Sequence, residues 1–173
     1  MAIVTNLTQR LGIEHPILLA PMGFVAGGAL AAAVSAAGGF GMIGGGYADP
    51  DWLEREFTAA GACRVGCGFI TWALAERPAA LDVALQHQPA AIMLSFGDAA
   101  PFLPTIKRAG VLAICQVQSL AQCGLTGFVD SCPLLVIVER EISSNSARPP
   151  RRGGRAPVAS GCLPPCTTSA RTV

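Results

Sequence analysis

Residues 15–46 read HPILLAPMGFVAGGALAAAVSAAGGFGMIGGG, and no other stretch constrains the architecture as strongly. The short apolar run Ile17–Ala20 predicts a buried strand, and the Ala-rich segment Gly28–Ala37 predicts a helix. Two glycines end that helix, and the apolar run Phe40–Gly44 then predicts a second strand. Strand, helix and strand in this order are typical of a parallel sheet covered by helices.

The same region raises the alternative of a membrane span, because Pro16 to Ala48 contain no charged residue. An apolar helix of about 20 residues is long enough to cross a bilayer. Here, however, Pro21 and nine glycines interrupt the run, which favours turns between buried strands and helices. We therefore predict no membrane association.

Three further apolar runs continue the pattern, at Val65–Ile70, Ala91–Ser95 and Leu112–Val117. Asp49 before Pro50 predicts one helix start, and Asp98 before Pro101 predicts another, which Gly110 ends. The sequence thus predicts an α/β fold with about four βα units and a fifth strand. This amounts to an incomplete (β/α)8 TIM barrel, for which roughly 250 residues is typical. A five-stranded flavodoxin-like sheet is the alternative from pattern alone.

Several motifs in order resemble the nitronate monooxygenase family, formerly called 2-nitropropane dioxygenases. After residues 15–46 these are VGCGFITWAL, AIMLSFGD and GVLAICQVQSLAQ, so that the resemblance covers about residues 7–122. The Pro-Met-Gly turn after the first strand also occurs in FMN-dependent enoyl-acyl-carrier-protein reductases and other flavin barrels. That turn alone therefore does not separate these enzymes.

The resemblance implies an FMN-dependent oxidoreductase that oxidatively denitrifies alkyl nitronates with O2. In such barrels ligands bind at the C-terminal ends of the strands. Carried over residue by residue, the backbone of the first turn would contact the flavin, and polar side chains after three later strands would hydrogen-bond it. The candidate cofactor-binding residues are Ala20, Pro21, Met22, Gly23, Thr71, Ser95 and Gln116.

The catalytic part of the family pattern is missing from this sequence. The family's catalytic His follows the fifth strand in a Gly-Gly-His segment, and its phosphate cradle follows the seventh and eighth strands. His15 precedes the first strand and His87 lies near a helix end, so neither is assigned as a catalyst. We predict weak or absent FMN binding and no turnover. The alternatives are an FMN-dependent NAD(P)H:quinone or enoyl reductase of the same barrel family, and a non-enzymatic fragment.

The chain divides by composition into residues 1–122, the predicted front half of the barrel, and residues 123–173. The first part carries a net charge of −2 and the second +3, and SSNSARPPRRGGRAP at 143–157 has a disorder-type composition. Leu134–Val138 could form a strand. We predict an otherwise irregular tail, and the abrupt change suggests translation in a shifted frame or a chimeric gene end as a hypothesis.

The remaining predictions concern partners and compartment. A net charge of +1 gives no argument for a nucleic-acid partner. Seven cysteines without a secretory pattern predict a cytoplasmic protein. The C-x3-C pairs Cys63/Cys67 and Cys162/Cys166 have no nearby His, so no metal site is predicted. A small-molecule substrate is the expected partner, and the sequence does not indicate the oligomeric state.

Overall fold

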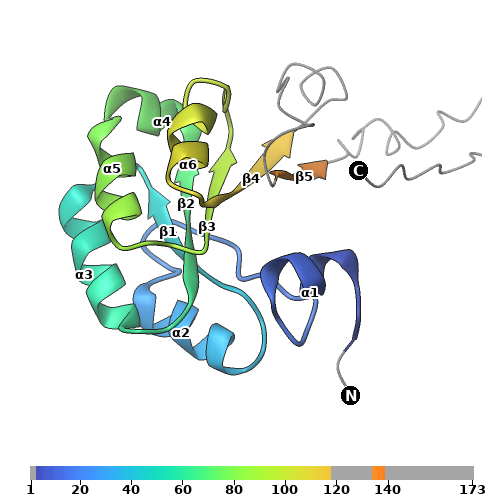
Figure 1. The fold of residues 1–173 in the computed structure, drawn as a ribbon. Coiled ribbons are helices and arrows are strands. Elements are labelled where there is room, and N and C mark those ends of the chain that lie inside the picture. Colours follow the sequence, from blue (N-terminus) through green and yellow to red (C-terminus); the bar gives the residue numbers. More distant parts are fainter. Residues whose placement is uncertain (1–2, 118–133, 139–173) are drawn as a thin grey trace, which may run out of the picture. The chain divides into compact units, whose positions relative to one another are not determined.

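Helices and strands alternate along the chain in the computed structural model, which describes residues 3–117 and 134–138 (Figure 1). The helices are α1 (Asn6–Leu11), α2 (Gly28–Ala36), α3 (Pro50–Ala60), α4 (Thr71–Glu76), α5 (Ala79–Gln86) and α6 (Leu103–Arg108). The strands are β1 (Gly41–Gly46), β2 (Val65–Ile70), β3 (Ala91–Ser95), β4 (Leu112–Val117) and β5 (Leu134–Val138).

All five strands form one parallel sheet in the order β1-β2-β3-β4-β5. Each strand therefore pairs with its neighbours in sequence, as in a singly wound barrel. A flavodoxin-like sheet has the order 2-1-3-4-5, so this arrangement contradicts the flavodoxin-like alternative. The predicted α/β fold is confirmed as part of a TIM barrel.

The two faces of the sheet bury different sets of side chains. Alternate residues such as Ile43 and Leu94 pack into a large core with helices α2–α6, which Figure 1 shows grouped beside β1–β3, apart from α1. The intervening residues, such as Met42 and Ile114, form a second cluster with Leu11 of α1. Successive side chains of a strand point to opposite faces of the sheet. We call the face that bears Met42 and Ile114 the inner face, and the helix-covered face that bears Ile43 and Leu94 the outer face.

Strand β2 has glycine at two inner positions, Gly66 and Gly68, whereas Val65, Cys67 and Phe69 pack into the outer core. A Cβ on Gly66 would lie 3.0 Å from the Phe40 ring and 3.3 Å from Met42 Cε. The absence of a side chain at Gly66 thus leaves room for these two neighbours. The run VGCGFI therefore contributes side chains to the outer core, and its two glycines place none on the inner face.

Helix ends follow the predicted chemistry in one case and depart from it in another. The Asp49 carboxylate accepts the Asp51 amide at 3.0 Å and the Trp52 amide at 3.3 Å, so the predicted cap of α3 is confirmed. The Asp98 prediction is wrong. Asp98 accepts the Ala100 amide at 3.0 Å in a turn, and α6 begins only at Leu103.

Two strand predictions also need correction. The predicted first strand, Ile17–Ala20, is reduced to a single parallel bridge between Leu18 and Phe40. The fifth predicted strand, with which the predicted half barrel ends, is β4, and it pairs in parallel with a further strand, β5. A strand at Leu134–Val138 is thus observed. The other predictions for residues 123–173 lie outside the described residues. No helix in the described ranges has the length and apolarity to cross a membrane.

Candidate functional site

A pocket of about 240 Å³ lies at the C-terminal ends of the parallel strands, on the inner face. Its lining combines the turn before α2 with the last residues of β2, β3 and β4. The lining residues are Ala20, Pro21, Met22, Gly68, Phe69, Ile70, Met93, Ser95, Phe96 and Gln116. Five of the seven predicted cofactor-binding residues therefore lie together in one pocket.

The turn at Ala20–Met22 is held against β1 by backbone contacts. The Met22 carbonyl accepts the Ala26 amide at 2.9 Å, and the Ala26 carbonyl accepts the Gly44 amide at 2.8 Å. A Cβ on Gly44 would lie 2.2 Å from the Met22 oxygen, a distance that no side chain tolerates. Glycine in β1 therefore allows the turn to lie directly on the strand end.

Pro21 occupies the inner face above β2. A Cβ on Gly68 would lie 2.4 Å from Pro21 Cγ, so the Pro21 ring fills the space that a side chain on β2 would need. The backbone of the turn is thereby fixed at the pocket wall. A backbone that can approach a flat ligand closely is what a flavin-contacting turn requires.

Two polar side chains reach the pocket from neighbouring strands. Ser95 ends β3 and is buried, whereas Gln116 lies near the end of β4 and is half-buried. They continue the inner rows of Met93 and Ile114 by two residues. A hydroxyl and an amide on an otherwise apolar wall can orient a planar ligand that carries ring nitrogens and carbonyls.

Thr71 and Gly23 border the site without lining the pocket. Thr71 is the first residue of α4 and only 2% exposed, and its Oγ1 has no hydrogen-bond partner among the described residues. It makes no helix-capping bond, so helix capping does not explain this buried hydroxyl. Gly23 lies against β1, where a Cβ would be 3.3 Å from Gly46 Cα. The cofactor-binding roles of all seven residues stay predictions.

Aromatic side chains surround this end of the sheet, and the sequence analysis did not assign them to the site. Phe24 follows the turn, Tyr47 follows β1 and Trp72 lies in the first turn of α4, and each is at least half-exposed. Trp52 on α3 joins them through its contact with Phe24. The signal available was that Tyr47 and Trp72 lie one and two residues beyond the ends of β1 and β2.

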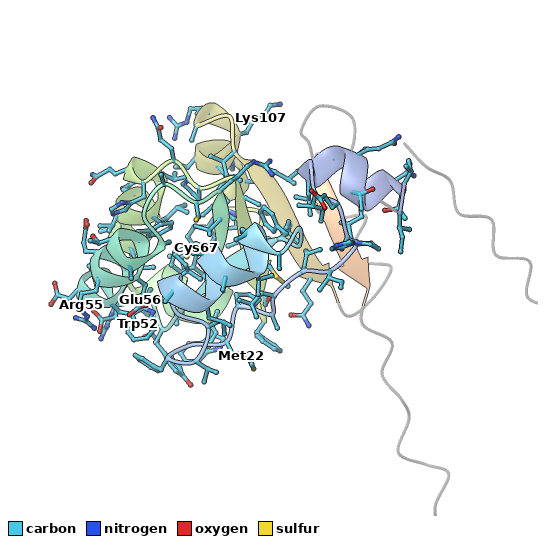
Figure 2. All side chains as sticks on the ribbon, turned by 90° about the horizontal axis from the view of Figure 1, so that it is seen from below. Met22, Trp52, Arg55, Glu56, Cys67 and Lys107 are labelled. Atoms are coloured by element: carbon cyan, nitrogen blue, oxygen red, sulfur yellow. The ribbon has the colours of Figure 1, made fainter. Side chains whose placement is uncertain are left out.

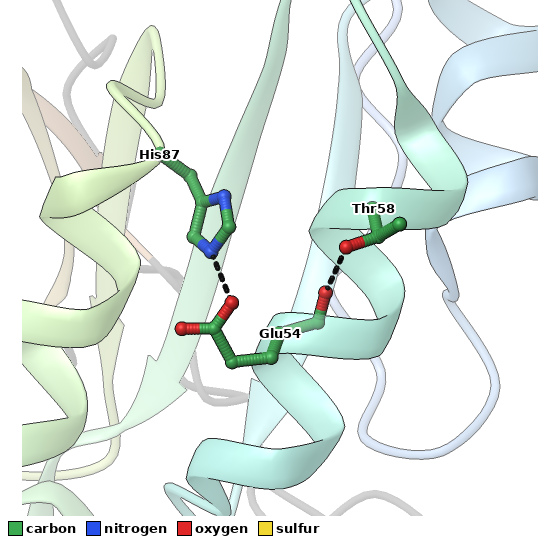
Figure 3. Close-up of polar contacts among 3 residues, drawn as sticks. All are labelled: Glu54, Thr58 and His87. Carbon is green, nitrogen blue, oxygen red and sulfur yellow. Dashed lines mark hydrogen bonds and ion pairs between the residues drawn. The ribbon is translucent and has the colours of Figure 1, made fainter.

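Neither histidine reaches the pocket. The His87 Nε2 atom lies 2.9 Å from the Glu54 carboxylate, and this contact joins the end of α5 to α3 (Figure 3). The His87 ring also stacks on Phe57 with 4.6 Å between centroids. His15 donates its amide to Gly38 before the predicted first strand. That neither histidine is a catalyst stays a prediction.

The environment of Cys67 is unfavourable for a nucleophilic thiol. It lies on the outer face of β2 within the helix-covered core. Burial raises the pKa of the Cys67 thiol from 9.0 to about 12, although hydrogen bonds with the backbone of Gly45 and Gly68 act in the opposite direction. The thiol therefore stays protonated at neutral pH, which excludes Cys67 as a nucleophile.

Comparison with known families supports the motif-based resemblance. Residues 4–88 match the family described as nitronate monooxygenase. A probable nitronate monooxygenase of Staphylococcus saprophyticus is 43% identical over 58 residues, which are 34% of this chain and 16% of that protein. With the same coverage, (3aS,4S,5R,7aS)-5-hydroxy-7a-methyl-1-oxo-octahydro-1H-indene-4-carboxyl-CoA dehydrogenase of Mycobacterium tuberculosis is 40% identical.

Solved structures show the same partial coverage. FabK from Thermotoga maritima superposes with a TM-score of 0.64 at 28% identity, covering 72% of this chain and 41% of FabK. Nitroalkane oxidase from Streptomyces ansochromogenes superposes with a TM-score of 0.55 at 23% identity, covering 71% of this chain and 45% of the oxidase. The second likeness concerns the fold alone. The chain thus spans less than half the length of these structures.

Proposed function

We propose that this chain, which resembles nitronate monooxygenases over residues 4–88, carries the flavin-contacting front part of an FMN-dependent oxidoreductase of that type. One observation carries the proposal. The residues that the resemblance assigns to the flavin come from four separate segments, and five of them line one pocket at the strand ends. Strand ends are where barrel enzymes bind their ligands.

The pocket fits the ring of a flavin better than the whole cofactor. Its volume of about 240 Å³ is below the roughly 300–1,000 Å³ of typical ligand sites. The wall is apolar except for Ser95 and Gln116, and Thr71 supplies a nearby buried hydroxyl that has no partner in the described part of the chain. These features suit a planar heterocycle with a few hydrogen-bonding atoms.

In this proposal each segment has a distinct task. The turn at Ala20–Met22 supports the ring through its backbone, and Ser95 and Gln116 hydrogen-bond its polar edge. FMN would supply the redox chemistry when bound. The resemblance places the proton-accepting His after the fifth strand of the barrel, which corresponds to β4 here, and the phosphate cradle after later strands. We therefore expect flavin-ring binding by this chain without oxidation of alkyl nitronates.

A second candidate function is a flavin-dependent reductase or dehydrogenase with a larger substrate. The indene-4-carboxyl-CoA dehydrogenase matches over as many residues as the nitronate monooxygenase does. The two candidates share the flavin-contacting segment. They differ in substrate, which the exposed aromatic side chains around the pocket would help to select.

The test is titration of the purified 173-residue chain with lumiflavin, which is the flavin ring without ribityl phosphate, followed by flavin fluorescence. We expect saturable binding, and FMN should bind no more than about tenfold tighter, a difference of about 1.4 kcal/mol. Gln116→Leu should weaken lumiflavin binding about tenfold through loss of its hydrogen bond. The matched control is Gln86→Leu, at an exposed position on α5.

Absence of saturable lumiflavin binding to a chain with the expected helical circular dichroism would refute the proposal. Equal binding by the Gln116→Leu and Gln86→Leu variants would refute the role of Gln116. Flavin retained at about one per chain with much tighter FMN binding would refute the expected lack of a phosphate site.

A further inference from the structure

Four aromatic side chains form a continuous surface beside the pocket, which we call the aromatic ledge: Phe24, Tyr47, Trp52 and Trp72. The Phe24 ring stacks with Tyr47 at 6.3 Å between centroids and meets Trp52 edge-on at 5.2 Å. Tyr47 in turn meets Trp72 edge-on at 5.9 Å. The ledge therefore connects the turn before α2 with the segments after β1 and β2.

The aromatic ledge continues into the pocket wall. Met22 and Phe96 line the pocket and are more than half-exposed, and Met22 precedes Phe24 by two residues. On the other side, a Cβ on Gly97, next to Phe96, would lie 3.2 Å from the Trp72 amide nitrogen. Figure 2 shows Met22 and Trp52 along the same margin of the molecule. A ligand in the pocket could thus extend onto the ledge without crossing a polar barrier.

The exposure of these rings is costly and calls for a physical reason. Phe24 is 60% exposed, and Tyr47 and Trp72 are each 50% exposed. Phe24 and Phe96 also have left-handed backbone conformations with φ of 60°. Such a conformation costs a bulky residue about 1–3 kcal/mol and is concentrated at ligand sites. Two strained, exposed phenylalanines beside one pocket favour a binding role.

The ledge is also held in position before any ligand arrives. The Trp52 indole N–H donates to the Gly44 carbonyl at 3.0 Å, which anchors the ring to β1. The Arg55 guanidinium lies 5.8 Å from the Trp52 ring centroid and packs over it. Aromatic rings fixed by packing and hydrogen bonds offer contact area at little further entropic cost.

We propose that the aromatic ledge binds an apolar, ring-bearing part of the substrate whose reacting part lies against a flavin ring held in the pocket. This inference rests on the proposed function and specifies its substrate class. The ledge presents ring faces and edges, and Tyr47 contributes its only hydroxyl. Such a surface favours fused or branched hydrocarbon rings over a short alkyl chain, which is too small to cover it.

The chain contains two tryptophans and one tyrosine, and all three belong to the ledge. Intrinsic fluorescence therefore reports on the ledge alone. The experiment titrates the full 173-residue chain with 2-decalol, a saturated bicyclic alcohol, and separately with ethanol. We expect a saturable change in tryptophan emission with 2-decalol at a concentration at least tenfold lower than any change with ethanol.

The deciding variant is Phe24→Ala, which retains both tryptophan reporters. It should weaken 2-decalol binding about tenfold, an effect of about 1.4 kcal/mol. The matched control is Leu30→Ala, which removes an exposed apolar side chain of α2 outside the ledge and should leave binding unchanged. Circular dichroism establishes that each variant is folded.

The outcomes separate this inference from the proposed function. Lumiflavin binding without saturable 2-decalol binding, or an equal effect of Phe24→Ala and Leu30→Ala, would overturn the ledge assignment and leave the flavin proposal standing. If the chain binds 2-decalol but not lumiflavin, the flavin proposal and the assignment of the ledge to the substrate of that flavin enzyme are both overturned. Self-association in sedimentation that Phe24→Ala abolishes would assign the ledge to a second copy and overturn the inference.

Discussion

The two ends of the parallel sheet differ in how far their apolar side chains are buried and their buried polar groups are hydrogen-bonded. At the N-terminal end, Leu11 of α1 and Phe40 are buried together, and the Arg64 guanidinium donates to the Leu11 carbonyl. At the C-terminal end, aromatic rings are exposed, and the buried Thr71 hydroxyl has no partner within residues 3–117 and 134–138. We call the N-terminal end of the sheet, with Leu11 and Phe40, the floor, and the C-terminal end, with the exposed aromatic rings and Thr71, the mouth.

This difference supports the proposal that the N-terminal end contributes stability and that the C-terminal end carries the ligand site. In barrel enzymes the N-terminal face serves stability and the C-terminal face carries the active site. Buried apolar groups and paired polar groups at the floor lower the free energy of the fold. Strained and unpaired groups at the mouth raise it. They would be retained where a ligand completes their contacts.

The largest expected effect comes from removing a floor side chain. Phe40 is 1% exposed and packs between the strands and α1. Phe40→Ala should lower the free energy of unfolding by about 3–5 kcal/mol, because it leaves a cavity that the floor cannot fill. Denaturant unfolding followed by circular dichroism measures the change.

The control is Phe96→Ala at the mouth, where the same truncation affects a side chain that is 55% exposed. Its expected cost is below about 1 kcal/mol, as for most surface substitutions. Similar losses for the two variants would contradict the distinction between floor and mouth.

The next effect concerns the helix layer outside the sheet. The Gly28 amide donates to Glu56 at 2.8 Å, and a Cβ on Gly28 would lie 1.7 Å from the Glu56 carbonyl oxygen. Gly28→Ala should therefore force α2 and α3 apart and destabilise the chain by about 1–3 kcal/mol. Thermal unfolding with a far-ultraviolet signal provides the measurement.

Gly110→Ala controls for backbone conformation, because Gly110 has φ of 70° and open space around it. Its cost should be about 1–2 kcal/mol without any change in helix packing. Near-ultraviolet circular dichroism reports the environment of Trp52 on α3, so it should change for Gly28→Ala alone. An unchanged spectrum for Gly28→Ala would show that the helices tolerate the added methyl group.

The sequence predicted those parts of the fold that depend on local pattern. Continuous apolar runs marked β2, β3 and β4 because both faces of these strands are buried. The grouping of Ser95 with Gln116 was also predictable, because parallel strands end at the same edge. The capping signal at Asp49 was sufficient because Pro50 follows it directly.

Features that depend on tertiary contacts could not be predicted in this way. The run Ile17–Ala20 has the composition of a strand, but it forms one bridge only and then turns onto β1. Asp98 resembles a helix cap, but its carboxylate closes a turn ahead of α6. The aromatic ledge has no sequence period, because each ring comes from a different segment.

A smaller effect is expected at the buried hydroxyl of the mouth. Thr71→Val replaces the unpartnered Oγ1 with a methyl group of similar size. It should leave the free energy of unfolding unchanged or raise it by up to about 1–2 kcal/mol, because no hydrogen bond is lost. It should also weaken lumiflavin binding if the hydroxyl serves the ligand. Chemical denaturation and flavin titration test the two parts separately.

The contrasting variant is Ser35→Ala on α2. The Ser35 hydroxyl donates to the Arg64 carbonyl at 2.9 Å and accepts the Gly41 amide at 3.0 Å. Its removal should cost about 1–3 kcal/mol, since a buried amide loses its partner. Destabilisation by Thr71→Val as large as that by Ser35→Ala would show that the Thr71 hydroxyl has a partner in the folded chain.

The smallest expected effect concerns the left-handed backbone at Phe96. Glycine adopts φ of 60° without the steric cost that alanine meets, but it has more conformational freedom to lose on folding. Phe96→Gly should therefore be more stable than Phe96→Ala by about 0.5–1 kcal/mol, the difference between these two terms. Paired denaturant midpoints with equal slopes measure this difference. If Phe96→Gly is less stable than Phe96→Ala, the backbone at the mouth is not strained, and the exposed ring needs no ligand to account for its conformation.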